Sequence, residues 1–232
     1  MAEYAEYYQS TIARRSYGFK LALGGTGIGK TRGIRIAIND SKEAGLNYKF
    51  IYCANRIQLL NEMYDDLMED GFTEDEVIHL ERNRDTVINV ITGKYSTEFS
   101  QLLQDSKILH YAKVGNLDKV ALERACDQIK QIAGLVADKS QNFKVLELLS
   151  SPLESLGRDV LNFFKSILLL APDADKSYFI HHPVIQALFP YIAFTINPNA
   201  RVLLLTIHKA FHGFFDGYRT VNLNHFKDCI VF

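Results

Sequence analysis

The chain has 232 residues and a formal charge of −1, with 26 Lys and Arg residues against 27 Asp and Glu residues. Hydrophobic residues make up 47% and charged residues 23%, which is typical of a globular protein and excludes a disordered or fibrous chain. The longest strongly apolar run, 166–171, is far shorter than the roughly 20 residues of a membrane-spanning helix. The acidic N-terminus also lacks the basic flank and apolar run of a signal peptide, so we expect neither a membrane segment nor export.

The cysteines and the net charge limit the chemistry further. Cys53, Cys126 and Cys229 are odd in number and lack metal-ligand spacing, so we expect reduced thiols in a cytoplasmic protein. Because the net charge is close to zero, any contact with nucleic acid must come from a local basic surface rather than from the field of the whole molecule.

The first eighty residues alternate between strand-like and helix-like patterns. Helix-forming residues fill 4–15, and the short apolar run Phe19–Leu23 ends in glycines, which suits a strand. A second strand is predicted at Tyr48–Cys53, followed by apolar residues at helical spacing from Ile57 to Met68. This order predicts an α/β fold with a parallel sheet and crossover helices. The next apolar run, Val77–Leu80, fits either a third strand or a helix opened by a capping box at Thr73.

The middle of the chain is predicted to be helical. Apolar residues recur three and four apart between Lys94 and Ile180, and one helix is expected to begin with Ser151 as N-cap and Pro152 at its first position. Strand-like sequence returns at Arg201–Thr206 and again at Cys229–Phe232. We therefore expect a nucleotide-binding core formed by residues 1–93 and 195–232, interrupted by a helical insertion at 94–194.

One motif carries most of the functional information. The residues are Gly24, Gly25, Thr26, Gly27, Ile28, Gly29, Lys30 and Thr31. They match the phosphate-binding loop, in which glycines let successive backbone N–H groups surround a phosphate at a helix N-terminus. Lys30 would reach the β- and γ-phosphates, and the Thr31 hydroxyl would bind Mg²⁺. The motif lies between a predicted strand and a predicted helix, as the mechanism requires, and predicts ATP and Mg²⁺ as cofactors.

Two later segments resemble motifs of superfamily 2 helicases and translocases, a family with a RecA-like α/β fold. The second strand runs into Asn55 and Arg56, similar to motif Ia, and the fourth runs into Thr206 and Lys209, similar to motif Ib. The resemblance implies that these four residues grip the backbone of DNA or RNA without reading its sequence. Two alternatives stay open: Arg56 as a solvated cation, and Thr206 as a cap of the following helix.

Other polar residues give weaker signals. Gln9, preceded by Tyr8, stands about where superfamily 2 proteins place an adenine-recognising glutamine, although an exposed helix glutamine is the favoured alternative. His208 and His212 are four residues apart, but no third metal ligand accompanies them, and the pair His181–His182 resembles an ordinary loop.

Phosphoryl transfer in this family also needs an acid at the end of an apolar strand to hold Mg²⁺. Asp173 follows a proline within a helical pattern and is a poor candidate. The segment Cys229–Phe232 has the required apolar character, and we expect an Asp–Glu pair to follow it in a longer parent protein. The chain is accordingly interpreted as an N-terminal fragment with little hydrolytic activity of its own.

These patterns predict the N-terminal part of an ATP-dependent helicase or translocase, an ATP hydrolase in its full-length form. A P-loop kinase is one alternative, but kinase lids need several phosphate-clamping arginines, and only Arg124 and Arg158 lie between Lys94 and Ile180. A nucleotide-regulated interaction module is another, with the helical insertion as the surface for a protein partner.

Overall fold

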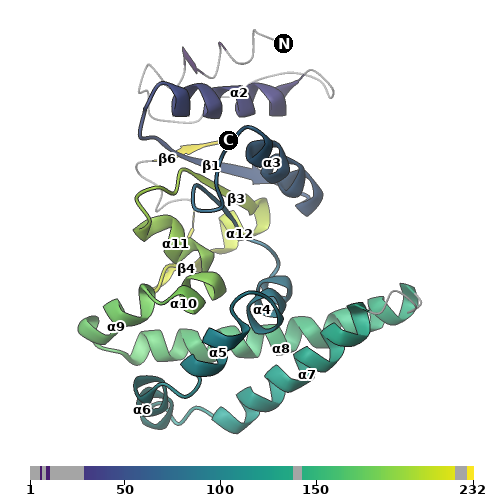
Figure 1. Ribbon diagram of the computed structural model, residues 1–232, viewed down its shortest axis with the longest axis vertical. Coiled ribbons are helices and arrows are strands. Elements are labelled where there is room, and N and C mark those ends of the chain that lie inside the picture. Colours follow the sequence, from purple (N-terminus) through teal and green to yellow (C-terminus); the bar gives the residue numbers. More distant parts are fainter. Residues whose placement is uncertain (1–5, 7–8, 11–28, 138–142, 223–228) are drawn as a thin grey trace. The chain divides into compact units, whose positions relative to one another are not determined.

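The structure is a computed structural model that describes residues 6, 9–10, 29–137, 143–222 and 229–232. Contacts divide the chain into two units (Figure 1). The sheet unit comprises the described residues of 1–79, 197–213 and 222–232, and the helical unit comprises those of 80–196 and 214–221. The predicted strand at Phe19–Leu23 and most of the predicted helix at 4–15 lie outside the described residues.

The sheet unit is built on four parallel strands. They are β1 (Lys49–Ala54), β2 (Val77–His79), β3 (Val202–Thr206) and β6 (Cys229–Val231), in the order β2-β3-β1-β6. Every pair is parallel, and the register sets Ala54 beside Thr206 and His79 beside Leu204. The α/β class with a parallel sheet is therefore confirmed, and Val77–His79 is a strand rather than a helical turn.

Both faces of the central strands are buried, which explains their continuous apolar sequences. On one face, Phe50 and Tyr52 of β1 join Leu204 of β3 in a core cluster. On the other face, Ile51 and Leu203 have no exposed surface. A parallel strand covered on both sides cannot alternate apolar and polar residues, so β3 contains four buried apolar residues in succession.

Two helices cover the first of these faces. Helix α2 (Lys30–Glu43) packs Ile34 and Ile38 into the core cluster, and α3 (Ile57–Glu69) contributes residues spaced three and four apart. The contributing residues of α3 are Leu60, Met63 and Leu67. The helix expected after the glycine motif and the helix expected from apolar spacing after Ile57 are both confirmed. A third, short helix, α12 (Ile207–His212), directly follows β3.

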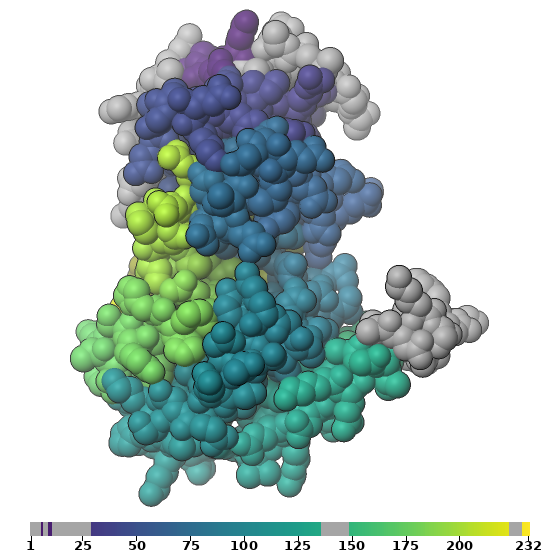
Figure 2. All heavy atoms as spheres, viewed as in Figure 1, coloured from purple at the N-terminus to yellow at the C-terminus, as the bar shows by residue number. Residues whose placement is uncertain are grey.

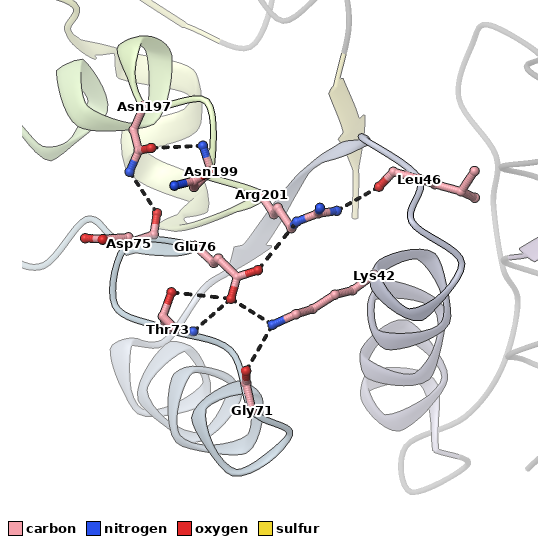
Figure 3. A network of polar contacts seen from close by, with 9 residues as sticks. All are labelled: Lys42, Leu46, Gly71, Thr73, Asp75, Glu76, Asn197, Asn199 and Arg201. Carbon is pink, nitrogen blue, oxygen red and sulfur yellow. Dashed lines mark hydrogen bonds and ion pairs between the residues drawn. The ribbon is translucent and has the colours of Figure 1, made fainter.

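A polar network fixes one edge of the sheet, where β2 and β3 begin (Figure 3). The carboxylate of Glu76 accepts hydrogen bonds from the Lys42 ammonium at 2.7 Å and from the Thr73 backbone N–H at 3.0 Å. Its other oxygen lies 3.5 Å from Nε of Arg201, whose guanidinium also donates to the carbonyl of Leu46 at 2.7 Å. The network therefore ties the last turn of α2 to the amino ends of β2 and β3.

The helical unit contains eight helices among its described residues. They are α4 (Asn83–Thr92), α5 (Ser96–Leu102), α6 (Ser106–Val114), α7 (Lys119–Ala137), α8 (Phe143–Leu170), α9 (Asp173–Ile180), α10 (Pro183–Leu188) and α11 (Pro190–Ile196). A short antiparallel pair, β4 (Phe214–Phe215) and β5 (Thr220–Val221), completes it. Its core is separate from that of the sheet unit, and α9, α10 and α11 form one contiguous green patch in Figure 2.

Helices α4, α7 and α8 pack against one another at the centre of this unit. Gly157 of α8 permits a close approach to α4, because a Cβ atom there would stand 3.1 Å from the Cα of Arg84. Phe164 of α8 is fully buried and meets Phe99 of α5 with ring centroids 5.8 Å apart. The unit therefore has its own aromatic core, as a domain requires.

The expected helix start at Ser151 is wrong. Helix α8 begins at Phe143 and passes through Pro152. The Ser-Pro-x-Glu signature is a local one, and tertiary packing overrides it here: Leu153 within it and Val160 beyond it are buried in the unit core. The helical unit also begins at Leu80 rather than at residue 94, because α4 packs with α7 and α8.

Within the described residues, no helix combines the length and apolar composition that a membrane crossing requires. The three cysteines are free thiols. Burial raises the pKa of Cys53 to about 11 and that of Cys126 to about 12, so neither is a reactive thiolate near neutral pH.

Candidate functional site

The first turn of α2 has the backbone geometry of an anion site. Gly29 precedes the helix with φ 80° and ψ 22°, a left-handed conformation that glycine adopts without strain. The first helical hydrogen bond runs from the Gly33 N–H to the Gly29 carbonyl, so the N–H groups of residues 30–32 have no acceptor within the helix. No acidic residue lies in this turn. The positive end of the helix dipole is thus left to attract an anion.

This turn lies toward the carboxyl edge of the sheet. Helix α2 is anchored at its last turn by the bond from Lys42 to Glu76, at the amino edge. At its first turn, the hydroxyls of Thr31 and Tyr52 hydrogen-bond to each other, and Tyr52 lies in the carboxyl half of β1. The 14 residues of α2 span about 21 Å, which matches the length of a six-residue strand. The helix therefore runs antiparallel to the strands, and Gly29 to Thr31 lie at the edge where open α/β sheets bind ligands.

Tyr52 is a residue of this site that sequence analysis missed. Its side chain is buried in the core on the α2 side of the sheet, and burial raises its pKa, while the hydrogen bond with Thr31 acts in the opposite direction. Thr31 lies three and seven residues before Ile34 and Ile38, on the inward face of α2. The strand alternation of 49–54 could have placed Tyr52 on this face, but not its contact with Thr31.

A cavity of about 770 Å³ opens beside this turn. The described residues that line it are Gly29, Lys30, Thr31, Arg32, Arg35, Ile36, Asn39, Asp66 and Asp70. Cations gather toward the start of α2, whereas the two carboxylates lie in α3 (Asp66) and directly after it (Asp70). A cavity of this size can hold a nucleotide-sized ligand.

Arg35 neutralises the two carboxylates of the cavity. Its guanidinium donates to Asp70 through Nε at 2.5 Å and through the second terminal nitrogen at 2.6 Å, and it lies 2.7 Å from Asp66. The Arg35 hydrogen bond, helped by one from the Asn39 amide, holds the pKa of Asp70 below its usual range. The carboxylates on the acidic side of the cavity are thus paired with Arg35.

Gln9 lies away from the first turn of α2. Its side-chain amide donates to the carboxylate of Asp40, which is ten residues, or about 15 Å, along α2 from Lys30. The structure therefore does not bring Gln9 to the Gly29–Thr31 turn. Residues 24–28 and Tyr8 lie outside the described residues.

The four predicted nucleic-acid contacts are brought to one edge. Ala54 and Thr206 are register partners at the ends of neighbouring parallel strands. Asn55 and Arg56 follow β1 and are exposed, and Lys209 lies in the first turn after β3. The hydroxyl of Thr206 accepts a hydrogen bond from the Lys209 backbone N–H at 3.2 Å. Thr206 therefore caps α12, which is the alternative role that the sequence had left open for it.

His79 ends β2 next to this edge and was not predicted. Its ring stacks on Tyr64 with centroids 6.0 Å apart, and among the described residues its Nε2 is buried without a hydrogen-bond partner. Burial first, and then the charge of Lys209, lower its pKa to about 4, although Asp65 opposes them. His79 is therefore neutral at physiological pH.

The other histidines have ordinary settings. A ring nitrogen of His182 accepts from the Val184 N–H and caps α10, and Nδ1 of His181 lies 2.7 Å from the Ser177 carbonyl. His208 and His212 are exposed on α12 with ring centroids 4.3 Å apart. Among the described residues, no group of three or more His, Cys, Asp or Glu side chains could hold a metal ion.

The last strand adjoins β1 as a parallel neighbour. The Cys53 N–H donates to the Phe232 carbonyl at 2.9 Å, and the ring of Phe232 stacks on Phe50. The carboxyl end of β6 therefore lies close to that of β1. By contrast, Asp173 is the first residue of α9, with Pro172 as its N-cap, and does not end a strand.

No protein-family model matches this chain, and no curated protein matches it.

Proposed function

We propose that this chain is the N-terminal part of an ATP-dependent nucleic-acid helicase or translocase with a P-loop NTPase core. One observation carries the proposal. A left-handed glycine followed by Lys30 and Thr31 opens a helix at the carboxyl edge of a parallel sheet. That arrangement suits the β- and γ-phosphates of ATP, since it combines the first turn of a helix, an ammonium and a hydroxyl.

The site residues have separate roles in this proposal. The Gly29–Thr31 backbone surrounds phosphate, and Lys30 neutralises its charge. The hydroxyl of Thr31 is a suitable ligand for the Mg²⁺ of ATP-Mg, being a hard oxygen donor next to the phosphate position. A bound metal would offset the phosphate charge. The chain's own contribution is to orient Thr31 through Tyr52.

The nucleic-acid part of the proposal is supported by the register. Arg56 and Lys209 follow strands that are direct neighbours, so both can contact consecutive phosphates of one strand. None of the four described strands of the sheet unit contains an Asp or Glu that could hold Mg²⁺. We therefore expect the chain to bind ATP but to hydrolyse it slowly.

The test is binding of a fluorescent ATP analogue in the presence of Mg²⁺. Lys30→Ala should weaken binding at least tenfold, because it removes a charge-assisted contact to phosphate. Lys113→Ala is the matched control, since Lys113 is exposed at the end of α6 in the helical unit, and it should bind like the wild type. Equal affinities of Lys30→Ala and the wild type would refute the proposal, as would single-turnover hydrolysis at rates normal for an ATPase.

An interaction module regulated by nucleotide is the second candidate. It is favoured by apolar side chains exposed on the helical unit, among them Val114 at 61% and Leu169 at 51%. If Lys30→Ala abolished the binding of a protein partner and left turnover in the full-length parent unchanged, this second candidate would be the better one. A P-loop kinase has no comparable support from the described residues.

A further inference from the structure

Helix α12 presents an aromatic and apolar face to solvent. Phe211 is 68% exposed and Ile207 is 40% exposed, and their spacing of four residues places them on one face of the helix. Ala210 is fully buried, on the side of the helix that packs against β1 and β3 of the sheet unit. The exposed rings of His208 and His212 lie beside this face. The helix therefore carries three rings outward on a fixed support.

The sequence around this face lacks carboxylates. There is no Asp or Glu from Lys176 to Phe215, nor from Ala44 to Asn61, although the whole chain has 27. The two segments meet where Ala54 pairs with Thr206, and they carry Arg56 and Lys209 there. Asp65 of α3 lies near enough for it and Lys209 both to act on His79, but the two segments that carry Arg56 and Lys209 have no acidic residue of their own, which suits a polyanion.

We infer that α12 is a base-stacking platform for single-stranded nucleic acid, on which the ring of Phe211 stacks against an unpaired base. The inference rests on the proposed function and goes beyond it, because the contacts proposed above reach only the phosphate backbone. Cations that follow a backbone, combined with an exposed aromatic ring, are the two elements of single-strand binding without sequence preference. A duplex offers no free base face to such a ring, so the platform selects the single strand.

A protein partner fits the same surface less well. Protein interfaces have a well-packed apolar centre, usually of several neighbouring side chains. Here two apolar side chains are flanked by two histidines and a lysine on a six-residue helix. The charge and the ring content therefore favour a polyanion with aromatic bases over an apolar protein surface.

The test uses fluorescence anisotropy of a short labelled oligothymidylate and of the same strand with abasic sites, titrated with the 232-residue chain. Phe211→Ala should weaken binding of the oligothymidylate at least about fivefold, and should leave binding of the abasic strand unchanged. Phe211→Trp should retain the affinity, whereas Phe211→Leu, which keeps apolar area without an aromatic face, should behave like Phe211→Ala.

The salt dependence of the binding affinity distinguishes the contribution of base stacking from that of phosphate contacts. Arg56→Ala should reduce the slope of log affinity against log salt by about 1, and Phe211→Ala should leave that slope unchanged. Arg158→Ala, an exposed arginine on α8, is the control and should change neither quantity.

The inference is overturned if Phe211→Ala binds the oligothymidylate as tightly as the wild type, or if it loses affinity equally for the abasic strand. It is also overturned if Phe211→Leu retains full affinity, because the face would then be a general apolar surface suited to a protein. ATP binding by the same samples distinguishes the two proposals: intact nucleotide binding with no effect of Phe211→Ala refutes the platform alone.

Discussion

His79→Phe should remove a large part of the pH dependence of stability of the sheet unit. The imidazole of His79 is half-buried and stacks on Tyr64, and its buried Nε2 has no hydrogen-bond partner among the described residues. Phenylalanine keeps the stacked ring and removes the polar atoms. Burial, with the nearby charge of Lys209, lowers the folded pKa of His79 to about 4, against a reference value of 6.5 for the unfolded chain.

The sign follows from proton binding. Below pH 6.5 the unfolded chain takes up a proton at His79, whereas the folded chain does so only near pH 4. The unfolded state therefore binds more protons between these values, and stability falls as the pH is lowered through this range. Between pH 7 and pH 5 the loss amounts to at most about 2 kcal/mol. His79→Phe should abolish that part of the loss, because phenylalanine does not titrate.

The measurement is urea unfolding followed by circular dichroism at pH 7 and pH 5. His110→Phe is the control, since His110 is exposed on α6 in the helical unit, and it should retain the pH dependence of the wild type. At pH 7 the His79→Phe variant should be as stable as the wild type or more stable, because a buried atom without a partner has been removed. An identical difference between pH 7 and pH 5 in His79→Phe and the wild type would show that the imidazole titrates alike in both states.

Three further experiments test other parts of the structure by thermal or urea unfolding. Glu76→Gln should cost about 1–3 kcal/mol. Burial, the largest single influence, raises the pKa of Glu76, but the bonds from Lys42 and Thr73 lower it overall. This stabilisation should therefore be present at neutral pH and disappear as the pH falls below about 4.5, and Glu76→Gln should lack that acid loss. A double-mutant cycle of Tyr52→Phe and Thr31→Val should give a coupling energy of about 1 kcal/mol, and additive effects would exclude their hydrogen bond. Pro152→Ala should raise the melting temperature, because a helix interior prefers alanine by about 3 kcal/mol; an unchanged or lower value would argue against a continuous α8.

Most helices and strands of the sheet unit could be predicted from patterns in the sequence. The glycine motif before Lys30 predicted α2, the apolar spacing from Ile57 predicted α3, and the β-branched and aromatic run at Tyr48–Cys53 predicted β1. The run Val77–Leu80 stayed ambiguous because its identity depends on its partner: it becomes a strand by pairing with β3, which is more than a hundred residues away in the sequence.

Local signals were least reliable where tertiary packing decides. The capping signature at Ser151 predicted a helix start inside what is one continuous helix. A related signature at Thr73 does form its hydrogen bonds to Glu76, but in a turn that leads into a strand. Short-range hydrogen bonds are compatible with several backbone paths, so the core contacts of neighbouring elements select among them.

The sequence was sufficient to predict which residues begin the helix at the candidate site. It was not sufficient to predict which side chains contact them. The spacing of Lys30 and Thr31 after glycine placed them correctly at the start of a helix. The contact of Tyr52 with Thr31, the position of His79 and the exposure of Phe211 all depend on register and helix orientation, which no spacing of residues encodes.

The length of α2 matters for the site as much as the glycine that precedes the helix, because the network around Glu76 fixes the other end of the helix. The helix is held at Lys42 and must deliver Lys30 to the opposite edge of the sheet. One residue inserted between these positions would rotate the Lys30 end by about 100° and advance it by about 1.5 Å. Such a chain could keep its anchor or its alignment with Tyr52, but not both. The number of residues in α2 therefore determines whether Lys42 and Lys30 can both occupy their positions at opposite edges of the sheet.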